Sequence, residues 1–126
     1  MEQAIDALEV AAELNVPVTL QSPPEAIFYA GSLYLLHMFE FAQKACPKAK
    51  ARFVIDAADS EAEAIAAMQT GHKHLRSNAS EEIRTRLADI ASQCGAEFIT
   101  GPFQALDMEN IDNPKASCRA WLLQTV

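Results

Sequence analysis

The stretches Arg52-Phe53-Val54-Ile55-Asp56 and Ser60-Glu61-Ala62-Glu63 decide the fold of this chain. The first stretch has an apolar centre, which is typical of a strand whose two faces are both covered by helices. The second is an S-x-x-E capping box, which predicts the start of a helix that ends before Gly71. A buried strand followed at once by a capped helix is the repeating unit of a parallel α/β sheet.

The same unit recurs on both sides of this stretch. Strands are predicted at residues 16–20, 52–56, 72–76 and 97–100. Helices are predicted at 2–14, 23–45, 60–69, from a cap at Asn78 or Ser80 to Cys94, and from Asn113-Pro114 onward. We therefore predict a compact, layered α/β domain with a mainly parallel sheet of about four strands. Its β-α-β-α-β-α-β core is flanked by N- and C-terminal helices. It is expected to form one domain over 1–126, with a helix at 2–14, strand–helix repeats at 16–101 and a helical segment at 103–126.

Composition excludes several classes of function. The chain has 126 residues, 50% of them hydrophobic, and a formal net charge of -7, with its basic residues scattered, so we expect no nucleic-acid partner. No apolar run approaches the roughly 18 residues of a membrane span, and acidic residues stand where a signal peptide is basic. Three cysteines without a C-x-x-C pair give no complete disulfide framework, so a cytoplasmic location is expected.

Polar residues follow the ends of the predicted strands, where ligands bind in open parallel sheets. The candidates for holding a small polar ligand are Gln21, Asp56, Arg76, Ser77, Asn78 and Thr100. Asp56 and Asp59 are the candidate catalytic residues, because acids at strand ends often serve as general bases or metal ligands. The alternative is that they only end the strand and lead into the next helix. Ser22 is predicted to cap the helix that begins at Pro23.

Motifs for cofactors, metals and nucleophiles are nearly absent. The four glycines form neither G-x-G-x-x-G nor a P-loop, and no G-x-S-x-G elbow occurs, so no cofactor is expected. His72 and His74 form H-x-H, which on a strand directs both rings to one face and, with His37 or Asp56, suits zinc or iron. Because this spacing often arises by chance, surface histidines on an edge strand are the preferred interpretation, and no metal is expected.

The stretch from Ala26 to Ala45 is apolar around most of its circumference, whereas a surface helix normally buries one stripe. Two accounts compete: the terminal helices cover it within the chain, or a symmetric homodimer does. We favour the homodimer, with these residues at its interface: Ile27, Tyr34, Leu35, Met38 and Phe41. Gly31 allows either a close helix approach or a break into two helices.

These patterns predict a non-catalytic binding or regulatory module that acts as a homodimer, through its strand-end edge or its apolar helix. The alternative is a small enzyme that uses Asp56 as base or metal ligand and Arg76 to hold an anionic substrate. A third account is a scaffold subunit of a hetero-complex. Whether the chain is an enzyme stays open.

Overall fold

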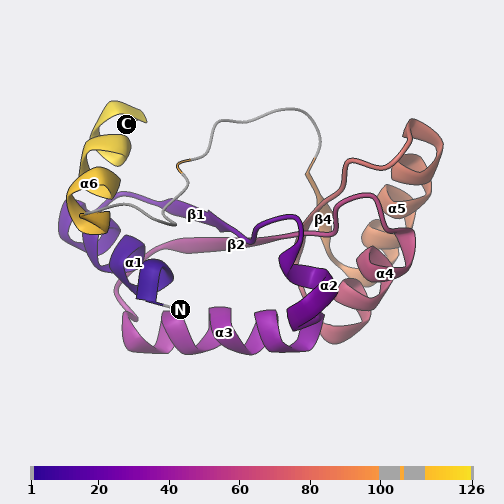
Figure 1. Ribbon diagram of the computed structural model, residues 1–126, viewed down its shortest axis with the longest axis horizontal. Coiled ribbons are helices and arrows are strands. Elements are labelled where there is room, and N and C mark those ends of the chain that lie inside the picture. Colours follow the sequence, from indigo (N-terminus) through magenta and orange to yellow (C-terminus); the bar gives the residue numbers. More distant parts are fainter. Residues whose placement is uncertain (1, 100–105, 107–112, 126) are drawn as a thin grey trace. The chain divides into compact units, whose positions relative to one another are not determined.

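The fold was described from a computed structural model, which places residues 2–99, 106 and 113–125. The four strands form one all-parallel sheet in the order β1-β2-β3-β4 (Figure 1). The elements are α1 (Glu2–Leu14), β1 (Val18–Gln21), α2 (Ala26–Ala30), α3 (Ser32–Ala45), β2 (Ala51–Asp56), α4 (Glu61–Thr70), β3 (His74–Arg76), α5 (Glu81–Cys94), β4 (Glu97–Phe98) and α6 (Pro114–Thr125). The predicted α/β class, with its parallel sheet and flanking helices, is confirmed.

The chain divides into two compact units. Unit 1 contains Met1–Leu20, Met38–Arg52 and Pro102–Val126, and unit 2 contains Gln21–His37 and Phe53–Gly101. β1, α3 and β2 each contribute residues to both units. That residues 1–126 form a single domain stays a prediction.

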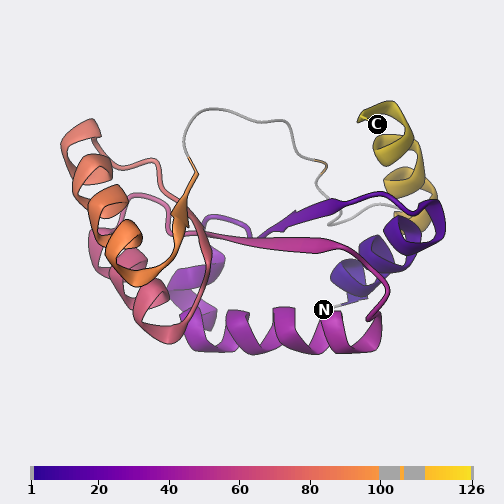
Figure 2. The ribbon, with the colours of Figure 1, turned by 180° about the vertical axis from the view of Figure 1, so that it is seen from behind.

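In unit 1, α1 packs against α6 (Figures 1 and 2). The contact buries apolar side chains from both helices, among them Leu8, Ala11, Cys118 and Leu122. As predicted, α6 begins at Asn113-Pro114, and the Asn113 side-chain oxygen accepts a hydrogen bond from the Ala116 N–H at 3.1 Å. A polar start and an apolar stripe thus define this helix.

Two ion pairs fix the direction of α6 along α1. Glu9 pairs with Lys115 and Glu13 pairs with Arg119. On both helices the second residue follows the first by four positions, so the two helices run in the same direction. The hydrogen bond and the negative charge of Glu9 raise the pKa of Lys115 above the usual value of a lysine. Because these side chains are exposed, the pairs orient the helices more than they stabilise them.

In unit 2, α4 and α5 lie side by side and pack on β3 and β4, respectively (Figures 1 and 2). Their buried faces are built from small and medium residues: Ala64, Ala67, Met68, Leu87 and Ala91. The helices end at Gly71 and Gly95, whose φ angles of 114° and 74° are left-handed, as predicted for these glycines.

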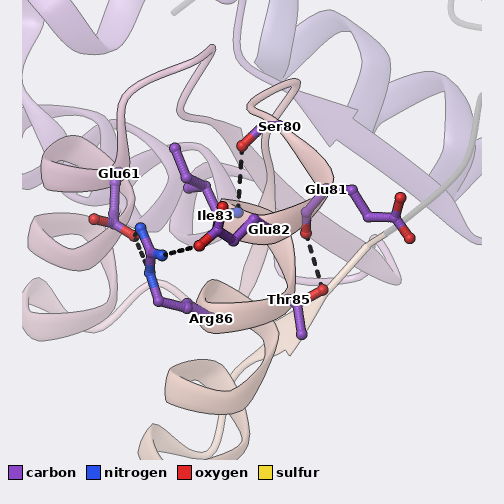
Figure 3. A network of polar contacts seen from close by, with 7 residues as sticks. All are labelled: Glu61, Ser80, Glu81, Glu82, Ile83, Thr85 and Arg86. Carbon is purple, nitrogen blue, oxygen red and sulfur yellow. Dashed lines mark hydrogen bonds and ion pairs between the residues drawn. The ribbon is translucent and has the colours of Figure 1, made fainter.

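Serine side chains cap both helices of unit 2. Ser60 Oγ accepts a hydrogen bond from the Glu63 N–H at 3.1 Å, which confirms the predicted capping box. Ser80 Oγ accepts one from the Ile83 N–H at 3.4 Å (Figure 3). Each cap satisfies a backbone donor that an uncapped helix start would leave without a partner.

A polar network on the surface of unit 2 joins α4 to α5 (Figure 3). The Arg86 Nε donates to Glu61 Oε2 at 3.0 Å, and its second arm reaches Glu82 Oε1 at 3.5 Å. These residues are largely exposed, so the network sets the relative orientation of the two helix starts more than it adds stability.

Several boundaries differ from the predictions, and for three of them the reason is local. β1 begins at Val18 because Pro17 has no N–H to give to a ladder. The apolar stretch 26–45 is not one helix, because Gly31 adopts φ 85° and ψ 154°, a conformation outside the helical region, and separates α2 from α3. β3 begins only at His74, so His72 precedes the strand.

The predicted cap at Ser22 is wrong. The helix begins later, at Ala26, and no side chain caps it. The Ser22 hydroxyl instead accepts a hydrogen bond from the Asp56 N–H at 3.0 Å. A donor that is distant in sequence therefore occupies the oxygen that the local pattern had assigned to the helix.

Candidate functional site

The register of the strands gives the sheet in unit 2 an apolar face and a polar face. Ile55 pairs with Leu75, and Leu75 pairs with Phe98, so these three side chains share one face. Asp56 pairs with Arg76 on the opposite face. Two neighbouring strands of a parallel sheet therefore end in an acidic residue, Asp56, and a basic residue, Arg76, that lie next to each other.

Four residues form what we call the polar edge: Gln21, Asp56, Arg76 and Ser77. Gln21 ends β1, Asp56 ends β2, Arg76 ends β3 and Ser77 follows directly. The carboxyl ends of adjacent parallel strands meet at one side of a sheet, so the topology brings these residues together. All four were predicted as ligand-binding residues from the sequence, and that role stays a prediction.

Asp56 is the most constrained residue of the polar edge. It is only 8% exposed, and its two carboxylate oxygens accept different hydrogen bonds. Oδ1 accepts from the Ala58 N–H at 2.8 Å, and Oδ2 accepts from Gln21 Nε2 at 3.1 Å. With its backbone N–H bound to Ser22 Oγ, the residue is held on three sides. Such a carboxylate has one orientation only.

The turn after Asp56 contains a left-handed alanine. Ala58 has a φ of 52°, which costs a residue with a Cβ about 1 kcal/mol. Its carbonyl accepts hydrogen bonds from the Ser77 hydroxyl at 2.7 Å and from the Asn78 N–H at 2.8 Å. The turn between β2 and α4 is thus tied to the segment after β3. No sequence signal marked Ala58, because alanine is not typical of this conformation.

Gln21 presents a buried acceptor at the polar edge. Its Nε2 faces the Asp56 carboxylate, which accepts but does not donate, so Oε1 must point the other way. This Oε1 atom is buried and receives no hydrogen bond from the described residues. Leaving a buried acceptor unsatisfied costs about 1–3 kcal/mol. The atom is therefore suited to a donor that comes from outside the described part of the chain.

Arg84 carries a second buried atom of this kind. Its Nε is buried and has no hydrogen-bond partner among the described residues. Arg84 is in the first turns of α5, which begins shortly after β3 ends at Arg76. It lies on the same helix stripe as the buried Leu87 and Ala91. Sequence reasoning missed this residue, although its spacing from Leu87 is the spacing of a buried face.

The other predicted site residues lie at or beyond the margin of the polar edge. Asp59 and the side chain of Asn78 are exposed, and only the backbone of Asn78 bonds to the turn. Thr100 lies outside the described residues. Of the two candidate catalytic acids, the structure gives Asp56 a defined environment and leaves Asp59 facing solvent.

His72 and His74 make separate contacts. The Nε2 atom of buried His72 lies 2.7 Å from the Ser32 carbonyl oxygen. The Nε2 atom of His74 lies 3.6 Å from a Glu97 carboxylate oxygen. Because His72 precedes β3, strand alternation does not direct the two rings to one face. No group of three or more His, Cys, Asp or Glu side chains within the described residues could hold a metal ion.

The predicted interface residues divide by burial. Ile27 and Leu35 are 1% and 3% exposed and belong to the interior of the chain, whereas Met38 is half-buried. Tyr34 and Phe41 are exposed. Four large apolar side chains that flank Gly31 in the sequence are each more than half exposed, and we call them together the aromatic corner: Phe28 (54% exposed), Tyr29 (78%), Leu33 (53%) and Tyr34 (60%). The sequence prediction missed three of them because it left the break at Gly31 undecided.

The three cysteines are free thiols in different environments. Cys94 is exposed, Cys46 is half-buried and Cys118 is buried. Burial, with a smaller contribution from the charge of Asp6, raises the pKa of the Cys118 thiol. A raised pKa lowers the thiolate fraction, so Cys118 is a poor nucleophile at neutral pH.

Neither protein-family models nor curated proteins gave a match to this chain. Among the helices that the structure describes, none combines the length and the apolar character needed to span a lipid bilayer.

Proposed function

We propose that this chain is a non-catalytic binding module that holds a small polar ligand at the polar edge of unit 2. The observation that carries the proposal is the Gln21 Oε1 atom, a buried acceptor without a donor among the described residues. A ligand that donates a hydrogen bond to this atom removes an energetic cost that the protein otherwise bears. The ligand class is therefore small molecules with hydroxyl, amide or ammonium donors.

The hydrogen bonds of Asp56 favour binding over catalysis. Both carboxylate oxygens already accept hydrogen bonds from the protein, at 2.8 and 3.1 Å. Because both oxygens are engaged, the carboxylate is fixed in position, which suits a group that orients a ligand. Arg76 lies beside Asp56 in the strand register and carries guanidinium donors, so a ligand that also has an acceptor group fits better than one with donors alone.

We place the protein in a reducing compartment such as the cytoplasm. All three cysteines are free, which agrees with a setting where thiols stay reduced. The small-enzyme alternative gains no specific support from the described residues, since Asp59 is exposed and the histidines are bound elsewhere.

A thermal-shift experiment tests the proposed ligand class. The probes are sugar alcohols, small primary amides and free amino acids, each added in excess to the purified protein. We expect at least one class to raise the melting temperature, because a ligand that binds only the folded state stabilises it. We expect the free amino acids to give the largest shift, since they carry both donor and acceptor groups.

A pair of glutamine variants assigns the shift to the site. Gln21→Leu removes the acceptor and should abolish the shift, whereas Gln93→Leu, an exposed glutamine on α5, should keep it. The proposal is wrong if no probe stabilises the natural protein. It is equally wrong if the shift survives in Gln21→Leu, because the ligand would then bind elsewhere.

A further inference from the structure

We infer that the aromatic corner is the contact surface of a symmetric homodimer, so that its partner is a second copy of this chain. The corner consists of Phe28, Tyr29, Leu33 and Tyr34, each more than half exposed. Large aromatic side chains are enriched at the centres of protein interfaces and are unusual as a cluster on a monomer surface.

The charge pattern around the corner favours a second copy over a different partner. From Ala26 to Phe39 the sequence contains no Asp, Glu, Lys or Arg, although the whole chain carries a net charge of -7. Two copies repel one another wherever their acidic surfaces meet. An uncharged apolar surface is where they approach with least repulsion, whereas a basic partner would be drawn to the acidic surfaces instead.

The backbone at the corner is also accessible. Gly31 lies between the two pairs of corner residues, and a Cβ placed there would meet no atom within 4 Å. Since glycine adds no side chain, the backbone of a neighbouring copy can come close at this point. In a twofold interface the same patch of both copies takes part, so rings of one copy can stack on rings of the other near the open glycine.

The area of the corner agrees with a dimer of moderate affinity. At these exposed fractions, three aromatic side chains and one leucine expose roughly 400–500 Å² per copy. Two copies would bury roughly 800–1,000 Å² from these residues alone, and the polar rim that surrounds any such contact brings the total near the lower limit of a specific interface.

Sedimentation velocity on the purified chain tests this inference. We expect a concentration-dependent species of twice 13.8 kDa at about 100 μM protein. Tyr29→Glu should weaken dimerisation by at least about tenfold, because each copy would then bury an unpaired carboxylate in an apolar contact. Tyr29 is 78% exposed, so the variant should fold, and far-UV circular dichroism verifies that it does.

A matched variant separates this surface from others. Leu123→Glu places the same charge on an apolar residue of α6 that is 58% exposed, and it should dimerise as the natural chain does. Tyr29→Ser, which adds no charge, should also weaken the dimer and covers the case in which Tyr29→Glu misfolds. A natural chain that stays monomeric at this concentration, or a dimer that both Tyr29 variants leave intact, overturns the inference.

Discussion

Asp56 organises the end of β2 through three hydrogen bonds to residues of different segments. Gln21 comes from β1, Ser22 from the following turn, and Ala58 from the turn after Asp56 itself. Because the two carboxylate oxygens hold different partners, the side chain fixes both the position of β1 and the left-handed turn. Its contribution to structure can therefore be measured apart from any role in ligand binding.

We expect Asp56→Ala to lower the free energy of unfolding by about 1–3 kcal/mol, since the Ala58 N–H and the Gln21 amide both lose their acceptor. Urea denaturation followed by circular dichroism measures the change. The control is Asp59→Ala, an exposed carboxylate three residues on, for which we expect a change within about 0.5 kcal/mol. Equal losses in the two variants would contradict the role given to Asp56.

At the scale of single residues, the sequence predicted whatever depends on near neighbours. The cap at Ser60 and the left-handed ends at Gly71 and Gly95 follow from residues within one helical turn. Ser22 has the same local pattern as Ser60, but the Asp56 N–H, 34 residues away, takes its hydroxyl. A contact over this sequence distance depends on how the strands are arranged in the sheet, so the local pattern at Ser22 could not predict it.

The break between α2 and α3 is the element that the sequence left undecided. Gly31 has φ 85° and ψ 154°, a combination that side chains with a Cβ adopt only under strain. The break turns Phe28 and Tyr29 outward while Ile27 and Leu35 point into the chain. Within α3 the buried residues Ser32, Leu35, Phe39 and Ala42 share one stripe, so in the described part of the chain this helix is covered on one side only.

We expect Gly31→Ala to destabilise the protein by about 1–3 kcal/mol, although the space around it is open, because the cost lies in the backbone. Gly95→Asn is the comparison, since Gly95 has φ 74° and ψ 22°, where asparagine is tolerated, and it should cost less. Thermal unfolding measures both variants. If Gly31→Ala were as stable as the natural chain and richer in helix, α2 and α3 would have merged into one.

At the scale of the whole molecule, alternation of strands and helices was enough to predict the parallel sheet. Each strand is linked to the next by a helical segment, which antiparallel hairpins do not need. The order β1-β2-β3-β4 could not be derived in this way, because alternation does not say which strands become neighbours. The contacts of the polar edge could therefore not be predicted either, since Gln21 reaches Asp56 only if β1 and β2 are adjacent.

We expect the homodimer to become tighter as salt rises. Each copy carries a net charge of -7, and ions screen the repulsion between copies while the uncharged aromatic corner keeps its attraction. Sedimentation equilibrium at about 20 mM and about 500 mM sodium chloride should show a dissociation constant that falls several-fold. A dimer that weakens with salt would instead be held by ion pairs and would not use the aromatic corner.

The pairing of α1 with α6 has a consequence for the order of folding. Glu13 and Arg119 lie 106 residues apart in sequence, so a long loop must close before the two helices gain anything from each other. α4, β3 and α5 follow one another directly, and their contacts form at short range. A nascent chain can thus assemble the α4–α5 region before α6 is available to α1. Unit 1 then folds more slowly, because its helix pair depends on residues that are far apart in sequence.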